Sequence, residues 1–169
     1  MKAYLSLGSN LGDRGAYLRQ GLALINLLDG VKLLAVSGFY ETSPWGKLDQ
    51  PDFLNAAAVI EAELAPGALL HALQQIEAQS HRRRLVHWGE RTLDIIHCEG
   101  VAFDSGELTL PHPYFRERRF VLLPLAEIAP ALVIGDKTID AWLADCQDQG
   151  EVVPVPGSPS DHKLCLIAC

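Results

Sequence analysis

One acidic residue and two groups of arginines are the parts of this 169-residue chain whose types and spacing point to chemistry. Asp94 stands in "WGERTLDIIHCEG", where a Trp-Gly turn leads into a run of strand-forming residues. Seven of the 14 lysines and arginines fall in two short windows, and these seven are Arg82, Arg83, Arg84, Arg91, Arg116, Arg118 and Arg119. A guanidinium keeps its charge and offers a fork of donors that matches phosphate oxygens, so these windows predict a phosphate site. The charge pattern alone leaves open a second interpretation, a basic face that is simply solvated.

The charge of the whole chain indicates that such a phosphate compound is small. The 14 basic residues stand against 21 acidic residues, which gives a net charge of −7. An acidic protein is a poor general binder of nucleic acid or of anionic membranes, so we expect neither as a partner. Two groups of arginines in such a chain suit a compact polyphosphate. The sequence has no G-x-x-x-x-G-K-[ST] motif, so any nucleotide is held without a P-loop.

The stretch "ETSPWGKLDQPDFLNAA" predicts a site for a flat heterocycle. Phe53 and Asn55 are two residues apart in a strand-like segment, so their side chains share a face. An aromatic ring beside an amide, which both donates and accepts hydrogen bonds, fits the face and the edge of such a ligand. The turn-rich segment before Phe53 is too long for a tight hairpin and is typical of a functional loop. The alternative is that Phe53 belongs to the core and that Asn55 caps a turn.

The elements that must position these residues follow from the spacing of apolar side chains. Strands are expected in residues 3–10, 32–40, 53–64 and 92–98, and helices in 13–30, from Pro66 onward, in 117–130 and in 139–146. Asp13 is a suitable N-cap and Gly30 a suitable end for the first helix, whereas Pro124 should interrupt the third. The order strand, helix, two strands, helix, strand predicts an α+β fold of ferredoxin-like type, a single domain in which helices flank an antiparallel sheet.

The predicted domain spans residues 1–153, and the linker-like "PVPGSPSDH" begins a C-terminal tail over 154–169. No apolar run approaches the roughly 18 residues of a membrane span. The N-terminus lacks the apolar region of a signal peptide. The four cysteines, Cys98, Cys146, Cys165 and Cys169, show no C-x-x-C spacing. We therefore expect a monomer in the reducing cytoplasm, without a disulfide framework or zinc site.

Six motifs occur in an order that resembles the 6-hydroxymethyl-7,8-dihydropterin pyrophosphokinase family. They are "YLSLGSNLGDR", "FYETSPWG", "DQPDFLNAA", "WGERTLD", "LPHP" and "RRFVLLPLAEIAP", and the resemblance covers roughly residues 3–134. It implies an enzyme of folate biosynthesis that transfers a pyrophosphoryl group from ATP to the hydroxymethyl group of the pterin with the help of Mg²⁺. Catalysis of this kind is mainly positioning and electrostatic stabilisation.

The resemblance also implies which residues form the site. The pterin would lie between Phe53 and Phe120, and its edge would bond to Asn55 and to the backbone around Thr42, Ser43 and Trp45, with Asn10 nearby. The residues implied for ATP are Gln74, Glu77, Arg82, Arg84, Trp88, Arg91, Thr109, His112 and Arg118. Among these, Arg82, Arg91 and Arg118 would face the phosphates, and His112 would approach the α-phosphate.

The chain departs from the family where the metal should bind. The family holds Mg²⁺ with two aspartates in a D-x-D motif, whose side chains share one face of a strand. Here Asp94 is followed two residues later by Ile96, and the run to the next glycine is one residue shorter. His97 and Glu99 would fall on the opposite face of a regular strand from Asp94, although a bulge would reverse this.

A second shortening precedes Trp88, and His87 stands where the family has an arginine. Even outer partners of a metal typically matter about 10- to 100-fold, so we expect transfer with Asp94 as the one carboxylate ligand and at a lowered rate. Replacing Ile96 by Asp should raise activity if only the ligand is missing. Two alternatives stay open: a pterin- or nucleotide-binding paralogue without transfer activity, and a structural or interaction module.

Overall fold

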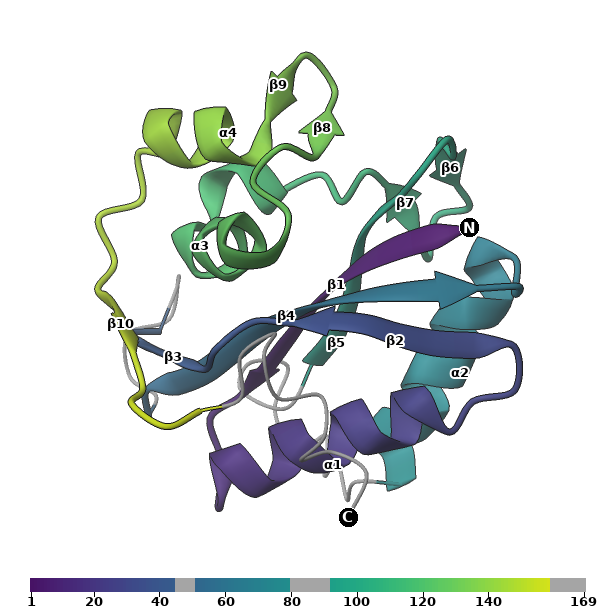
Figure 1. Ribbon diagram of the computed structural model, residues 1–169, viewed down its shortest axis with the longest axis horizontal. Coiled ribbons are helices and arrows are strands. Elements are labelled where there is room, and N and C mark those ends of the chain that lie inside the picture. The colour runs from purple at the N-terminus through teal and green to yellow at the C-terminus, as the bar shows by residue number, and fades with distance from the viewer. Residues whose placement is uncertain (45–50, 80–91, 159–169) are drawn as a thin grey trace.

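The computed structural model describes residues 1–44, 51–79 and 92–158. A six-stranded antiparallel sheet runs through the molecule with helices on both faces (Figure 1). Its strands lie in the order β10 (Val152–Pro154), β3 (Tyr40–Thr42), β4 (Phe53–Ala62), β1 (Lys2–Ser9) and β5 (Thr92–Cys98), and β2 (Val31–Val36) also pairs with β4. This arrangement confirms the predicted α+β fold of ferredoxin-like type.

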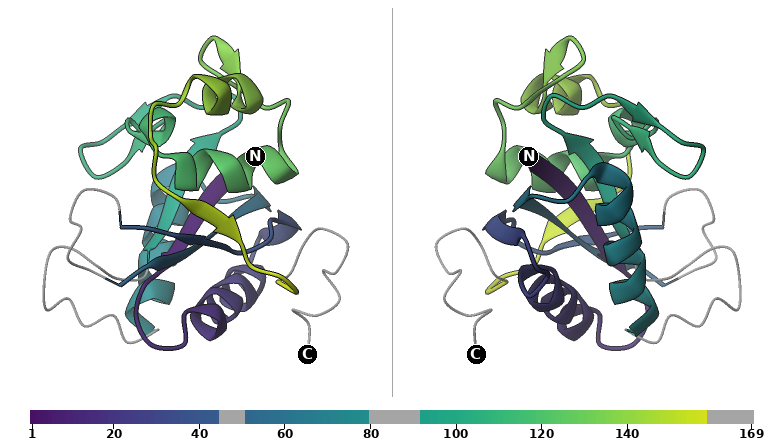
Figure 2. Two further views of the ribbon diagram at one scale, coloured as in Figure 1. Left: turned by 90° about the vertical axis from the view of Figure 1, so that its left-hand side faces the viewer. Right: turned by 90° about the vertical axis from the view of Figure 1, so that its right-hand side faces the viewer.

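Two layers of helices enclose the sheet (Figure 2). One face is covered by α1 (Arg14–Asn26) and α2 (Pro66–Gln79), and the other by α3 (Arg119–Ile128), on which α4 (Ile139–Asp145) packs. The remaining elements are short: the hairpins β6 (Phe103–Asp104) with β7 (Thr109–Leu110) and β8 (Val133–Ile134) with β9 (Lys137–Thr138), and the 3₁₀ turn η1 (Phe115–Glu117). In the part of the chain described, no helix is long and apolar enough to cross a membrane.

Both faces of the sheet are buried, which explains why its central strands are apolar almost throughout. Alternate residues of β1 enter two separate cores. Leu5 and Leu7 pack in the core beneath α1 and α2, whereas Tyr4 packs with Leu122 in the core beneath α3. The face beneath α3 is the one that opens into the functional site.

The strand predicted over residues 32–40 is two strands, because Ser37 interrupts it. The Ser37 amide donates to the Ala57 carbonyl oxygen at 2.9 Å, and the Ser37 hydroxyl oxygen accepts from the Ala57 amide at 2.8 Å. A side chain thus takes the place of a backbone carbonyl in the ladder, and the chain leaves regular pairing before β3. Short polar side chains compete with the backbone in this way.

The residues predicted to begin, end or interrupt helices are confirmed only in part. The Asp13 carboxylate accepts from the Ala16 amide at 2.9 Å and caps α1, as predicted. However, α1 ends at Asn26, and Gly30, with φ 71°, forms the turn into β2. The prediction that Pro124 interrupts its helix is wrong. Pro124 is buried within α3, where its ring removes a single hydrogen bond and the helix continues to Ile128.

A bulge in β5 changes which residues share a face with Asp94. Ser6 pairs with Asp94 and Leu5 with Ile95, but Tyr4 pairs with His97, so Ile96 is an extra residue. The Tyr4 and His97 rings are stacked on the same side of the sheet, with centroids 6.1 Å apart. The expectation from a regular strand, with His97 on the opposite face from Asp94, is therefore wrong.

Glu99 and Ile96 both make contacts away from the Asp94 carboxylate. The Tyr4 hydroxyl donates to Glu99 Oε1 at 2.6 Å, which holds this carboxylate at the far end of β5 from the site. Ile96 is 1% exposed and packs in the core beneath α3. Neither position supplies a second acid beside Asp94.

The C-terminal segment extends the sheet through β10, which pairs with β3. Beyond this strand, the Val155 amide donates to the Phe39 carbonyl oxygen at 2.8 Å, and the Phe39 amide donates to Ser158 Oγ at 2.9 Å. The predicted boundary between residues 153 and 154 falls inside β10. A separate tail over 154–169 stays a prediction, since residues 159–169 lie outside the described part.

Candidate active site

A cavity of about 410 Å³ opens between the sheet and the segment that leads into α3. Its lining residues come from β3 and β4, from β5, and from the stretch around η1 and the start of α3: Thr42, Ser43, Phe53, Asn55, Thr92, Asp94, Tyr114, Arg118 and Phe120. Seven of these residues are among those expected from the sequence to bind the pterin, the phosphates or the metal. A volume of this size suits a small-molecule ligand.

The floor of the cavity is polar and closely fitted. Asn55 is 3% exposed, and its Nδ2 donates to Thr42 Oγ1 at 2.6 Å. The Asn55 and Thr92 side chains approach β1 at Gly8, where an added Cβ would lie 2.8 Å from Asn55 Oδ1 and 3.2 Å from Thr92 Oγ1. The glycine therefore makes room for these side chains, and the Asn55 amide is fixed by packing and by its hydrogen bond.

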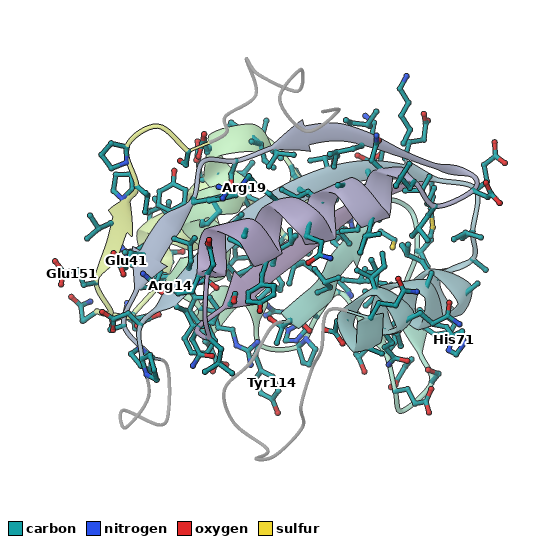
Figure 3. The ribbon with its side chains drawn as sticks, turned by 90° about the horizontal axis from the view of Figure 1, so that it is seen from below. Arg14, Arg19, Glu41, His71, Tyr114 and Glu151 are labelled. Atoms are coloured by element: carbon teal, nitrogen blue, oxygen red, sulfur yellow. The ribbon has the colours of Figure 1, made fainter. Side chains whose placement is uncertain are left out.

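The Arg118 guanidinium lies against aromatic rings of the cavity. Phe53 stands on β4, and Phe120 stands across the cavity in the first turn of α3. The Arg118 guanidinium lies 5.9 Å from the Phe120 ring centroid and 5.6 Å from that of Tyr114. A cation held by two ring faces is positioned at little entropic cost. Tyr114 is half-exposed and projects outward from the ribbon (Figure 3).

His112 is held as a neutral hydrogen-bond donor. Burial lowers its pKa, the Arg118 charge lowers it further, and the Asp94 charge acts in the opposite direction. The Tyr114 amide donates to His112 Nδ1 at 3.2 Å, so the ring proton of the neutral form sits on Nε2. The His112 amide also donates to the Ile96 carbonyl oxygen at 2.8 Å, which places His112 beside β5.

Arg14 links the two strands that carry Thr42 and Phe53. Its guanidinium donates to Glu41 Oε1 at 2.7 Å and to the Asp52 carbonyl oxygen at 2.8 Å, and these residues precede Thr42 and Phe53. Figure 3 shows Arg14 and Glu41 side by side at the end of α1. One side chain therefore links β3, the start of β4 and the first helix.

Glu77, expected from the sequence to contact ATP, is one of the buried residues of α2. It is 7% exposed on α2, and its Oε1 accepts from the Leu93 amide at 2.8 Å. This bond fixes the backbone of β5 immediately before Asp94. Gln74 is exposed one turn earlier on the same helix. Thr109 is also exposed, on β7, where its Oγ1 donates to Asp104 Oδ1 at 3.2 Å, and it does not line the cavity.

The other predicted residues fall away from the cavity or outside the described part. Asn10 is 4% exposed at the end of β1 and is not among the lining residues. Five predicted residues, Trp45, Arg82, Arg84, Trp88 and Arg91, lie in segments that the structure does not describe, as does His87.

Two lining residues were missed in the sequence. Thr92 stands two residues before Asp94, so strand alternation alone would have placed it on the same face. Tyr114 follows His112 by two residues in "PHPYF", but nothing in that short irregular stretch indicates where its ring points.

A cavity with facing aromatic walls, a fixed amide and a cation beside a carboxylate defines an enzyme that acts on a flat small molecule and a phosphate compound. The chain belongs to the 7,8-dihydro-6-hydroxymethylpterin-pyrophosphokinase family, whose model matches residues 4–130. The family expected from the six motifs is thereby confirmed. Its members transfer pyrophosphate from ATP to 6-hydroxymethyl-7,8-dihydropterin in folate biosynthesis.

Similar proteins of known name agree with this placement. A 2-amino-4-hydroxy-6-hydroxymethyldihydropteridine pyrophosphokinase of Methylorubrum extorquens is 46% identical over 151 residues, which cover 88% of this chain and 96% of that protein. A protein of the same name from Bacillus subtilis is 48% identical over 128 residues, covering 75% of this chain and 77% of that one.

Solved structures agree on the fold. A crystal structure of an HPPK-DHPS in complex with substrates superposes with a TM-score of 0.69 at 13% identity, and the match covers 85% of this chain. An HPPK-DHPS of Plasmodium falciparum superposes with a TM-score of 0.66 at 16% identity over the same share. In each case the chain spans 44% of the solved chain.

Proposed function

We propose that this chain transfers pyrophosphate from ATP to 6-hydroxymethyl-7,8-dihydropterin in the cavity beneath α3, with Asp94 as its acidic Mg²⁺ ligand and at a lowered rate. One observation carries the proposal. Five residues expected to bind the pterin, Thr42, Ser43, Phe53, Asn55 and Phe120, line a single cavity together with Asp94 and Arg118.

The pterin ring is placed between Phe53 and Phe120, where stacking on two aromatic faces favours a flat heterocycle. The Asn55 amide, already fixed by Thr42, offers a donor and an acceptor to the pterin edge. This orientation directs the hydroxymethyl group toward Asp94 and Arg118. Binding already restricts the motion of the attacking oxygen. The activation free energy of transfer is therefore lower, chiefly in its entropic part.

The phosphates are received by Arg118 and His112. The Arg118 guanidinium supplies a permanent charge in a partly buried position, where electrostatic attraction is stronger than in water. His112 Nε2–H supplies a neutral donor that adds no charge of its own. The family motifs also assign seven further residues to ATP: Gln74, Glu77, Arg82, Arg84, Trp88, Arg91 and Thr109. They assign Trp45 to the pterin and place Asn10 by the substrate site.

The residues present fit Mg²⁺ bound jointly by protein and substrate. Asp94 offers carboxylate oxygens at the cavity, and among the residues described no group of three His, Cys, Asp or Glu side chains forms a protein-only site. Mg²⁺ typically keeps several waters and binds through one or two carboxylates plus substrate phosphates. When bound, the ion neutralises charge on the phosphates. A single carboxylate in place of two supports a rate lowered by about tenfold or more.

We further infer a monomer in the cytoplasm. The chain carries four cysteines, of which Cys98 and Cys146 are buried and free, and a net charge of −7. These features suit a reducing compartment and a protein that stays apart from nucleic acid and anionic membranes.

The test is the formation of AMP from ATP and 6-hydroxymethyl-7,8-dihydropterin by the purified chain, followed by chromatography at several Mg²⁺ and Mn²⁺ concentrations. We expect AMP and the pyrophosphorylated pterin in equal amounts, and no AMP without the pterin. Pterin binding by calorimetry without any AMP would overturn transfer in favour of the binding paralogue. If neither the pterin nor ATP binds, the assignment of the cavity is wrong altogether.

A further inference from the structure

A carboxylate outside the residues matched by the family model bridges two walls of the cavity. Asp148 lies between α4 and β10, well past residue 130. Its Oδ2 accepts from the Arg119 amide at 3.1 Å, and its Oδ1 accepts from the Gly150 amide at 2.9 Å. Figure 1 shows this C-terminal segment running from α4 along one side of the molecule to β10, beside β3.

The first of these bonds acts on the helix that carries Phe120. Arg119 is the first residue of α3, and the first amides of a helix have no partner within it. The residue at the N-cap is Arg118, whose guanidinium has no acceptor atom to offer them. Asp148 therefore caps α3 from 29 residues further along the chain, and its negative charge also suits the helix dipole. Phe120 and Arg118, the cavity residues, flank the capped amide directly.

The second bond holds the turn at Gly150 that leads into β10, the strand that pairs with β3. After the turn at Gly150, the Glu151 carbonyl oxygen accepts from the Ser43 amide at 3.4 Å, and Val152 pairs with Thr42. A Cβ added at Gly150 would lie 3.0 Å from Asp148 Oδ1, so the turn is built tightly around the carboxylate.

The two walls meet at this point. A smaller hollow beside the main cavity is lined by residues of both, among them Ser43 and Phe120, together with Asp148 and Gly150. Asp148 thus bonds directly to the backbone at the start of α3, which forms one wall. It is linked to the backbone of the other wall through Glu151 and Val152, which follow Gly150 and contact Ser43 and Thr42.

We propose that Asp148 is a positioning residue for pterin binding, which sets the spacing between the wall that holds Phe120 and the wall that holds Thr42 and Ser43. The inference rests on the proposed function, since it concerns the same cavity. It adds that the C-terminal segment takes part in recognising the pterin more than in binding ATP.

The decisive variant is Asp148→Asn, which keeps the shape but replaces one acceptor oxygen by a donor. Its NH₂ group would then oppose either the Arg119 or the Gly150 amide. We expect the pterin Kd and KM to rise roughly 3- to 30-fold, as for the loss of a helix cap. The ATP KM should rise less than the pterin KM, because Arg118 is the one residue assigned to ATP that adjoins the amide capped by Asp148, whereas Thr42, Ser43 and Phe120 all belong to the pterin side. Asp148→Glu, which restores two acceptors, should recover part of the loss.

Asp145→Asn is the matched control. Asp145 stands three residues earlier, and its carboxylate pairs with Lys137 Nζ at 2.6 Å on the surface. This substitution should leave both the pterin Kd and the ATP KM unchanged. Gly150→Ala provides a second perturbation of the same link, in case Asp148→Asn fails to fold.

Titration of the pterin in the presence of a non-hydrolysable ATP analogue and Mg²⁺ separates the outcomes. A wild-type chain that binds no pterin would overturn the proposed function itself. If the wild type binds the pterin and both Asp148→Asn and Gly150→Ala bind it equally well, the inference about Asp148 is wrong while the function stands. Equal weakening of pterin and ATP would assign Asp148 a general role in stability and would likewise overturn the inference.

Discussion

The carboxylate of Glu77 on α2 accepts a hydrogen bond from the Leu93 amide at 2.8 Å, within the buried interior. A side chain expected from the sequence to contact ATP thus fixes the strand that carries Asp94. The bond joins helix α2 to the outer margin of β5, where β1 offers no partner.

Replacing Glu77 by Ala should destabilise the protein, because it leaves the buried Leu93 amide without this acceptor. We expect the free energy of unfolding to fall by about 1–3 kcal/mol. Urea titration followed by circular dichroism measures this change. Glu77→Gln keeps an acceptor oxygen and should cost less, and Gln74→Ala, an exposed site on the same helix, should cost almost nothing. Equal stability of Glu77→Ala and wild type would contradict the role assigned to this bond.

Replacing Thr42 by Val should weaken pterin binding without changing the shape of the cavity floor. Valine lacks the hydroxyl that accepts from Asn55 Nδ2, so the amide is no longer held in one orientation. We expect the pterin Kd to rise about tenfold, in line with a buried donor left unpaired. Thr42→Ser, which keeps the hydroxyl, should bind nearly as the wild type does. The prediction fails if the Val and Ser variants bind the pterin equally.

The ring of His112 should titrate below its ordinary pKa of about 6.5. Burial and the Arg118 charge lower this pKa, whereas Asp94 raises it. Replacing Asp94 by Asn removes the raising charge and should lower the pKa of His112 further, which NMR titration of the ring protons measures. Asp145→Asn, remote from the site, is the control and should leave this pKa unchanged.

The lowered pKa of His112 also determines the direction in which the stability of the protein changes with pH. Between the lowered pKa of folded His112 and about 6.5, the unfolded chain binds more protons than the folded one. The contribution of His112 to stability is therefore full above about pH 6.5 and decreases as the pH falls below it. A His112→Asn variant should lose less stability than the wild type between pH 7.5 and 5.5. A larger loss in the variant would contradict this sign.

Replacing Ile96 by Asp should destabilise the chain and bring no gain in transfer. Ile96 is 1% exposed in the core beneath α3, so a carboxylate there would be buried among apolar side chains. We expect a loss of several kcal/mol in unfolding free energy, against about 0.5–1.5 kcal/mol for Ile96→Val. A folded Ile96→Asp variant that forms AMP faster than the wild type would show that only a ligand was lacking. The absence of a gain indicates that the bulged strand itself differs from a D-x-D strand.

The shared face of Phe53 and Asn55 at the cavity was predictable from the sequence because its signals are local. Phe53 and Asn55 lie two apart in one strand, and the alternation that puts them on one face needs no knowledge of the rest of the fold. Phe120 and Arg118 were placed by motif order, and the cavity brings them opposite Phe53.

The remainder depends on pairing between distant segments. The bulge at Ile96 is defined by how β5 pairs with β1, and the sequence of β5 alone does not predict it. The break at Ser37 depends in the same way on Ala57, 20 residues away. Asp148 caps a helix whose start precedes it by 29 residues, so helix-capping rules, which look just before a helix, do not find it.

β5, the strand that carries Asp94, is an edge strand of the sheet in the described part of the chain. The unpaired backbone groups of an edge strand can pair with a strand of another molecule. Two backbone groups of β5 already have partners outside the sheet. The Leu93 amide donates to Glu77, and the Ile96 carbonyl oxygen accepts from the His112 amide. The contacts that place the acid and the imidazole therefore also discourage edge-to-edge aggregation. Variants at Glu77 should for this reason be watched for turbidity as well as for lost catalysis.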